Sequence, residues 1–492
     1  MKFLKHSGKP SWTISLVPFV VLVAVLTLVI HFFGADALSG GSQVSLMFAS
    51  AVVIIISMAR YKVPWKILED AILDNIRAVG SAILILFLIG AIAGTWMISG
   101  VVPTLIYYGM KVITPGLFLF AACLISALVA VMTGSSWTTI ATIGVALVGI
   151  GTALGFSSGW TAGAIISGAY FGDKISPLSD TTILASSSSG TPLFTHIKYM
   201  LVTTVPSFVI TVIVFLVVSL LHDTADAVQT GEFSEALQSK FRITPILFLV
   251  PLVTVYMIAR KLPAILTLFV ASCLAAVAAL IFQPQIVTEV ANGTGINLGE
   301  LTFTDGFKGI MITFYGSTNV LTGNEILDSL IATRGMTGML NTVFLIIMAV
   351  TFGGVLTGSG MLQSLTDLLI RFVKRTFSLV GATVGTGIFC NMATGDQYLS
   401  VILTSSMYKK LYEKKGYENR LLSRSVEDSA TVVSVLIPWN SCGMTQSTVL
   451  KVPTMDYLPY CLFNILSPLM SLAIAAIGYK IVKKKPNKKE VE

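Results

Sequence analysis

Charged residues are scarce in this chain, and their scarcity excludes most soluble folds. Asp, Glu, Lys and Arg make up 11% of the 492 residues, hydrophobic residues make up 54%, and the mean hydropathy is +0.84. Soluble domains usually carry about 25% charged residues. Windows such as 12–33 and 203–221 contain the roughly 20 apolar residues that span a bilayer, and similar windows recur along the sequence. We therefore predict an all-α polytopic membrane protein embedded in the lipid bilayer.

Motifs for disulfides, metals and nucleotides are also missing. Of the five cysteines, none forms a CxxC pair, so neither a disulfide framework nor a cysteine-based metal site is expected. They are Cys123, Cys273, Cys390, Cys442 and Cys461. The phosphate-binding pattern G-x-x-x-x-G-K-[ST] does not occur, which argues against a nucleotide-driven pump. We predict a protein that is not an enzyme and needs no cofactor.

The net charge of +8 does not indicate a nucleic-acid partner, because the basic residues lie in short groups beside apolar segments. Examples are 60–66, 371–375 and the end of the chain. These groups follow the positive-inside rule and predict that both termini are cytoplasmic. The apolar run 14–33 follows three lysines, as in a signal peptide, but it is longer than a typical h-region and many more spans follow. The sequence therefore predicts a multi-pass membrane protein that does not bind nucleic acid.

Tracing the basic groups through the sequence gives about 11–14 membrane segments, several of which could be half-helices or hairpins. We divide the chain into five regions on this basis. They are an N-terminal tail with the first transmembrane helix (1–42), a first repeat (43–242), a linking transmembrane helix (243–261), a second repeat (262–482) and a basic cytoplasmic tail (483–492).

The two repeats are visible in the sequence itself. Residues 72–100 resemble 326–360, with matching Ser-Gly pairs at an offset of 260. The motif "MTGSSWTT" then matches "ATGDQYLS", which pairs Gly134 with Gly395 at an offset of 261. Blocks that match in the same order, with similar offsets, indicate that one half of the chain is a copy of the other.

A third, looser block pairs Asp173 with Asp428 at an offset of 255. In the topology derived from charge, span 79–100 crosses outward and its counterpart 339–358 crosses inward, so the repeats are inverted. Inverted repeats whose corresponding segments are interrupted by glycine or proline are typical of secondary transporters, and their site lies near the membrane midplane. The expected fold is therefore two inverted structural repeats with discontinuous transmembrane helices.

Four carboxylates fall in apolar segments or at breaks within them: Asp173, Asp180, Asp396 and Asp428. Ionisable groups inside a bilayer are costly, which makes each of these residues a candidate for ion binding or proton coupling. The structural alternative is that each carboxylate caps a helix end or pairs with a nearby lysine.

Helical spacing limits how two of these carboxylates can act together. In an unbroken helix Asp173, Ser176 and Asp180 share one face, yet seven residues separate the two carboxylates by about 10 Å along the axis. No single small cation is chelated across that gap. Gly172 and Pro177 predict a break in the helix, which would expose backbone carbonyls as ligands for a hard cation such as Na⁺.

Further breaks are predicted at the glycines of the two Thr-Gly motifs, Gly134 and Gly395, and at Pro438. Oxygen-bearing side chains near the breaks are candidate ligands, with hydrogen bonding inside a kinked helix as the alternative. These candidates are Ser135, Ser136, Ser176, Thr181, Thr394 and Asn440.

Lys174 is a cation in the same segment. It could reach the cytoplasmic interface or pair with Asp173, which would lower the cost of both charges. In the alternative interpretation Lys174 is a coupling charge, neutral when the transported cation is bound and charged when it is not.

The motifs "FGDKISPLSDTT", "GTPLFTHIKYM" and "SRSVEDSATVVSVLIPWNSCG" resemble the signatures of the NhaC family of Na⁺/H⁺ antiporters. The resemblance covers nearly the whole chain and implies a bacterial inner-membrane protein that exchanges cytoplasmic Na⁺ for external H⁺. It also extends to relatives that exchange malate for lactate with Na⁺ and H⁺. One departure concerns the solute: "DTTILASSSSGT" has Ile183 and a serine run where many relatives have Asn and "APAVAGT".

We therefore predict a Na⁺/H⁺ antiporter that works by alternating access. Asp173 and Asp428 would bind Na⁺ and H⁺, one from each repeat, while Asp180, Asp396, Asn440 and nearby hydroxyls would shape the site. The alternative is a Na⁺/H⁺-coupled organic-anion exchanger of the malate/lactate type, or an amino-acid antiporter of the same family. An anionic solute would need a cation or exposed helix N-termini at its site, and Lys174 is the one intramembrane candidate for the cation. A homodimer is compatible with these features.

Two other classes are less consistent with the sequence. An intramembrane aspartyl protease would use two aspartates that share a proton, as "YFGD" and "ATGD" suggest. The matched halves and the additional Asp428 argue against it. A channel would need no inverted symmetry.

Overall fold

The computed structural model describes residues 10–33, 40–222, 229–260, 262–293, 301–371 and 373–483, and within them it contains helices and two isolated β-bridges but no strand. Nine of the described helices are long and apolar enough to cross a membrane, or up to eleven if each of two bent helix pairs is one span. The count therefore reaches the lower end of the predicted 11–14 segments. Residues 1–9 and 484–492, at the two predicted cytoplasmic ends, lie outside the described residues.

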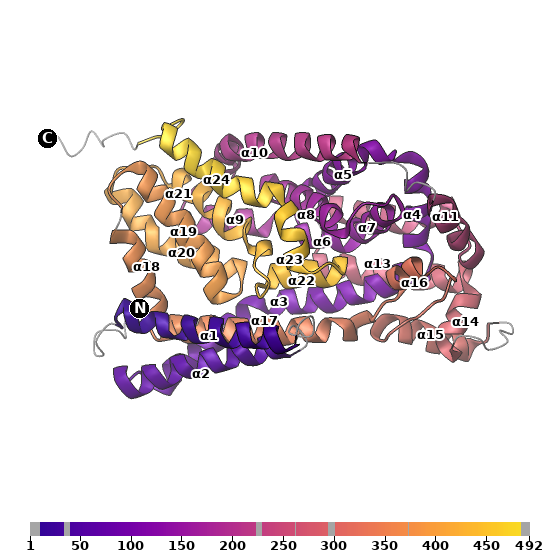
Figure 1. Cartoon of the computed structure of the whole chain (residues 1–492), viewed down its shortest axis with the longest axis horizontal. Coiled ribbons are helices and arrows are strands. Elements are labelled where there is room, and N and C mark those ends of the chain that lie inside the picture. Colours follow the sequence, from indigo (N-terminus) through magenta and orange to yellow (C-terminus); the bar gives the residue numbers. More distant parts are fainter. Residues whose placement is uncertain are drawn as a thin grey trace.

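Figure 1 shows the arrangement of the α-helices. The first half contains α1 (Trp12–Phe33), α2 (Gly41–Tyr61), α3 (Trp65–Ile98), α4 (Val101–Val112), α5 (Phe118–Thr133), α6 (Ser136–Thr139), α7 (Val145–Ala153), α8 (Ser158–Ile175), α9 (Asp180–Ser189), α10 (Leu193–Leu221) and α11 (Gln229–Lys240). The second half contains α12 (Leu249–Ala259), α13 (Ala264–Phe282), α14 (Pro284–Asn292), α15 (Phe303–Tyr315), α16 (Glu325–Ile331), α17 (Leu340–Gly358), α18 (Met361–Arg371), α19 (Thr376–Thr394), α20 (Gln397–Lys414), α21 (Asn419–Val426), α22 (Ser441–Leu450), α23 (Thr454–Tyr457) and α24 (Leu462–Ile477).

The matched helices α3 and α17 pack side by side and run antiparallel (Figure 1). Near the start of α3, Ile72 lies against Gly354 toward the end of α17. The Asn75 amide donates a hydrogen bond of 3.1 Å to the Val350 carbonyl oxygen, closer to the middle of α17. Counterpart helices that run in opposite directions are what an inverted repeat requires.

The predicted breaks at Gly134 and Gly395 are confirmed. Each glycine ends a helix, α5 or α19, in the left-handed conformation with a φ of 65°. The next residue caps the following helix: the Ser135 hydroxyl accepts from a backbone N–H of α6, and the Asp396 carboxylate accepts from a backbone N–H of α20. Glycine is required because a left-handed φ is costly for a residue with a Cβ.

The breaks at Pro177 and Pro438 are also confirmed, because each proline lies between the end of one helix and the start of the next. The chain leaves α8 at Ile175 and enters α9 with Ser179 as its N-cap. In the second half, Asn440 is the N-cap of α22. Both the prolines and these caps are separated by 261 residues, the same offset as the two glycines.

The offset of 261 is repeated in individual hydrogen bonds. Ser136 donates to Asp173 in the first half, and the residues at the same offset, Gln397 and Ser434, are hydrogen bonded in the second. The pairing of Asp173 with Asp428 at an offset of 255 is therefore wrong. That pairing matched two acidic residues, whereas the helix breaks show which positions are structurally equivalent.

Gly172 is not a helix break, contrary to prediction. It lies inside α8 and is buried where that helix crosses α5. A Cβ at this position would collide with the backbone carbonyl of Ala127. The glycine therefore allows close packing of two helices, as small residues commonly do in membrane proteins.

Gly134→Ala is expected to destabilise the protein, because the left-handed conformation costs a residue with a Cβ about 1–2 kcal/mol. The added methyl would also meet the backbone of Leu178. Gly385→Ala is the matched control: it lies within α19, and a Cβ there would have no neighbour within 4 Å. The thermal unfolding temperature in detergent should fall for Gly134→Ala and not for Gly385→Ala. Equal unfolding temperatures would show that Gly134 is not conformationally required.

Candidate cation site

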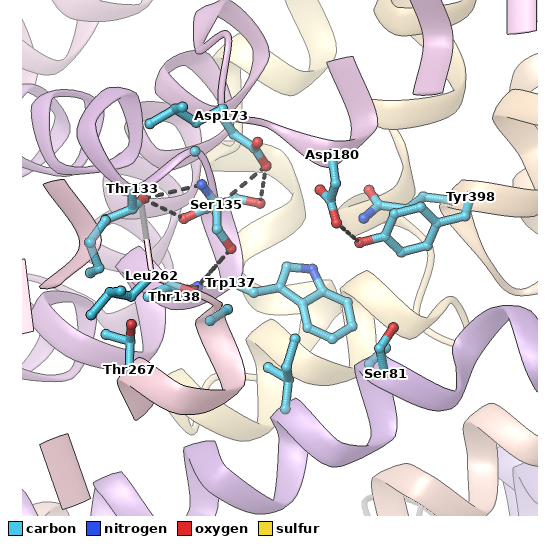
Figure 2. Close-up of a pocket in the computed structure, with 18 residues that line it drawn as sticks. Ser81, Thr133, Ser135, Trp137, Thr138, Asp173, Asp180, Leu262, Thr267 and Tyr398 are labelled. Carbon is cyan, nitrogen blue, oxygen red and sulfur yellow. Dashed lines mark hydrogen bonds between the residues drawn. The ribbon is translucent and has the colours of Figure 1, made fainter. Parts of the chain in front are cut away.

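A cavity of about 270 Å³ lies where the broken helices meet (Figure 2). The break between α5 and α6, the break between α8 and α9, and the start of α20 all contribute to its wall, together with one face of α3. Its polar lining residues include Ser135, Ser136, Asp173, Asp180, Gln397 and Tyr398. Four of the predicted ion ligands therefore share one cavity: Asp173 lies in the last turn of α8, and Ser135, Ser136 and Asp180 lie where α6 and α9 begin.

Asp173 is the buried carboxylate of this cavity, with 5% of its surface exposed. Its Oδ2 accepts two hydrogen bonds from Ser136, one from the backbone N–H at 3.1 Å and one from the hydroxyl at 2.7 Å. Its Oδ1 has no hydrogen-bond partner among the described residues. A buried carboxylate oxygen without a donor is costly, so this atom is where a cation or a proton would be stabilised.

Asp180 is the second carboxylate, at the first residue of α9. Its Oδ1 accepts from the Thr181 backbone N–H at 2.9 Å, and its Oδ2 accepts from the Tyr398 hydroxyl at 2.8 Å. Tyr398 belongs to α20 in the second half of the chain, so this bond joins the two halves across the cavity (Figure 2). The break at Pro177 lets Asp180 reach the same cavity as Asp173, as predicted for a discontinuous helix.

Asp396, Asn440 and Thr394 instead stabilise helix ends. Asp396 accepts from the Leu399 backbone N–H at 3.0 Å and from the Ser441 hydroxyl at 3.0 Å. Asn440 accepts from the Cys442 backbone N–H at 3.0 Å, and the Thr394 hydroxyl donates to the Cys390 carbonyl at 2.9 Å. None of the three lines the cavity described above.

The remaining hydroxyls, Ser176 and Thr181, also hydrogen bond to other protein groups, Ser176 to α5 and Thr181 within its own turn. Ser176 donates to the Val131 carbonyl oxygen at 2.8 Å, and the Thr181 hydroxyl is 2.9 Å from that of Ser179. These bonds fasten the break between α8 and α9. The two residues position Asp180 rather than line the cavity.

Asp428 lies elsewhere, in a fully buried ion pair with Lys174. The same oxygen of Asp428 also accepts from the Ser467 hydroxyl at 3.0 Å and from the Thr203 hydroxyl at 3.2 Å. Its other oxygen is 4.0 Å from Nε of Arg424. The structure therefore does not bring Asp428 to the cavity of Asp173, and Lys174 pairs with Asp428 rather than with its neighbour Asp173.

Sequence reasoning missed three residues of interest. Trp137 and Tyr398 line the cavity at equivalent positions, 261 residues apart, and could have been found by extending the repeat beyond its glycines. Glu427 is fully buried and neither of its carboxylate oxygens has a hydrogen-bond partner among the described residues. Its place directly before Asp428 was the one signal for it in the sequence.

Helices broken at equivalent positions around a buried carboxylate, in a chain of membrane spans, define a secondary transporter. The chain belongs to the Na⁺/H⁺ antiporter family, whose model matches residues 9–188 and 168–479. It is therefore an antiporter rather than an enzyme.

Three relatives illustrate the range of this similarity. The Na(+)/H(+) antiporter NhaC of Alkalihalophilus pseudofirmus is 37% identical over 422 residues, 86% of this chain and 87% of the relative. The arginine/ornithine antiporter ArcD of Halobacterium salinarum is 32% identical over 98% of this chain and 96% of its own length. The malate-2H(+)/Na(+)-lactate antiporter of Bacillus subtilis is 32% identical over 89% of this chain and 87% of its own length.

Proposed function

We propose that this antiporter exchanges Na⁺ for H⁺ and that both ions compete for Asp173. The observation that carries the proposal is the buried Oδ1 of Asp173, which has no hydrogen-bond partner among the described residues while Oδ2 is fixed by Ser136. A carboxylate held in this way can be neutralised by one cation or one proton, but not by both. The ion that leaves must therefore be replaced by the other.

The rest of the cavity suits transient binding. No cluster of three or more His, Cys, Asp or Glu residues arranged to hold a metal ion occurs in the described part of the chain. Asp173 and Asp180 would act with the Ser135 hydroxyl and with water as hard oxygen ligands for Na⁺. A site of few protein ligands releases its ion more readily than a dedicated metal site, as transport requires.

An organic anion is a poorer match for this cavity. No lysine or arginine is among the described residues that line it, and Lys174 is paired with Asp428. Exchange of the malate/lactate type would therefore depend on helix N-termini alone, and the carboxylates of Asp173 and Asp180 already lie at those of α6 and α9. We further propose that the protein resides in a bacterial inner membrane, with both termini in the cytoplasm. It would exchange cytoplasmic Na⁺ for external H⁺. That it forms a homodimer and that it needs no cofactor stay predictions.

In liposomes with an imposed pH gradient, added Na⁺ is expected to collapse the gradient. Because H⁺ competes with Na⁺ for Asp173, lowering the pH should raise the apparent KM for Na⁺ and leave the maximal rate nearly constant. Exchange rates measured over a matrix of pH and Na⁺ concentration check this expectation. If malate or lactate collapses the gradient and neither Na⁺ nor Li⁺ does, the proposed function is wrong.

A further inference from the structure

Two aromatic side chains line the cation cavity in addition to its carboxylates. Trp137 is 8% exposed, and its indole N–H has no hydrogen-bond partner among the described residues. Tyr398 lies across from the Asp173 side of the cavity and donates its hydroxyl to Asp180. In Figure 2 the Trp137 indole lies below the Asp180–Tyr398 pair, so that acidic and aromatic groups share one space.

The cavity is larger than Na⁺ requires. Its volume of about 270 Å³ corresponds to roughly nine water molecules at about 30 Å³ each. A bare Na⁺ in this space would leave most of it to water. A small organic cation would occupy more of the volume than Na⁺ and could contact the aromatic rings at the same time.

We infer that this cavity also binds small planar organic cations of the guanidinium class, in competition with Na⁺. Guanidinium presents N–H donors in a plane that matches a carboxylate, which would satisfy the unpartnered Oδ1 of Asp173. It also stacks on aromatic faces, which Trp137 and Tyr398 supply. This inference deepens the proposed function and rests on it, because it assigns a second class of ligand to the same site.

The lining of the cavity limits the class of organic cation further. It contains no lysine or arginine among the described residues, so the carboxylate end of an amino acid would find no cationic partner. A cation without its own negative group is therefore the better fit. Tetramethylammonium has a similar charge but no N–H donor, which makes it the matched control ligand.

The test measures Na⁺/H⁺ exchange by the full-length protein in liposomes with guanidinium chloride present. Guanidinium should raise the apparent KM for Na⁺ without changing the maximal rate, and tetramethylammonium should do so about tenfold less effectively. Trp137→Leu should raise the inhibition constant of guanidinium about tenfold and change the KM for Na⁺ less than threefold. Trp137→Phe should keep most of the guanidinium affinity, because it preserves an aromatic face.

Calorimetric titration of guanidinium into the purified protein supplies a readout that does not depend on exchange. Binding that is lost in Asp173→Asn and weakened in Trp137→Leu supports the inference. The inference is overturned if Na⁺ exchange is normal and guanidinium neither binds nor alters the KM for Na⁺, and the proposed function then stands. If guanidinium binds and Na⁺ drives no exchange, the proposed function fails while the inferred guanidinium site stands.

Discussion

Asp173→Asn is expected to abolish Na⁺-dependent exchange while leaving the protein folded. The substitution removes the charge that stabilises Na⁺ and the group that would carry the proton. Loss of one member of a buried charge pair typically costs about 3–5 kcal/mol, which corresponds to roughly 10²–10⁴-fold in affinity. The side chain of Asn can still accept the hydrogen bonds that Ser136 donates to Oδ2, so the break at Gly134 should keep its structure.

The matched control is Asp396→Asn, the same chemical change at a buried aspartate in the second half. Asn is as good an N-cap as Asp, and it can accept from the Leu399 backbone N–H as Asp396 does. The exchange rate of Asp396→Asn should stay within about threefold of the rate of the unsubstituted protein. Measurements of Na⁺-driven H⁺ movement in liposomes, at equal amounts of reconstituted protein, compare the two variants. Exchange by Asp173→Asn at the rate of the unsubstituted protein would refute the site assignment.

The helix breaks were predictable because their cause is local. Gly134 and Gly395 end helices in a conformation that the backbone of glycine adopts readily, and Pro177 and Pro438 interrupt helices by chemistry that acts within one turn. The same local signals placed Asp173 and Asp180 at one break. The prediction of a break at Gly172 was wrong because the sequence alone does not distinguish a glycine that lets two helices approach closely from a glycine that ends a helix.

The partners of the charged residues were not predictable, because they depend on contacts far apart in the sequence. Lys174 is adjacent to Asp173 along the chain, yet it pairs with Asp428, 254 residues away. Successive residues of a helix point in different directions, so the two neighbours face different surroundings. The same holds for Asp396 and Asn440: the sequence predicts ion ligands at both positions, whereas in the structure they are the N-cap residues of α20 and α22.

Lys174→Met is expected to lower the stability of the protein by up to about 3–5 kcal/mol, because it leaves the fully buried Asp428 with only Arg424, 4.0 Å away, as a cationic neighbour. Asp428→Asn should be strongly destabilising for the opposite reason, since the lysine then lacks its carboxylate. The double variant removes both charges of the pair and retains a hydrogen-bond acceptor for Thr203 and Ser467, although Arg424 also loses its neighbouring carboxylate. Its loss of stability should be much smaller than the sum of the single losses.

Denaturant unfolding of the two single variants and the double variant in detergent gives the coupling energy. If the sum of the two single losses equals the loss in the double variant to within about 0.5 kcal/mol, the ion pair contributes no energy of its own. Exchange by the double variant then separates the two roles considered for Lys174. If the pair is structural, the folded double variant transports Na⁺ at a rate near that of the unsubstituted protein, because its cavity and Asp173 are unchanged. A folded but inactive double variant would instead identify Lys174 and Asp428 as a coupling pair, whose charges must separate during the transport cycle.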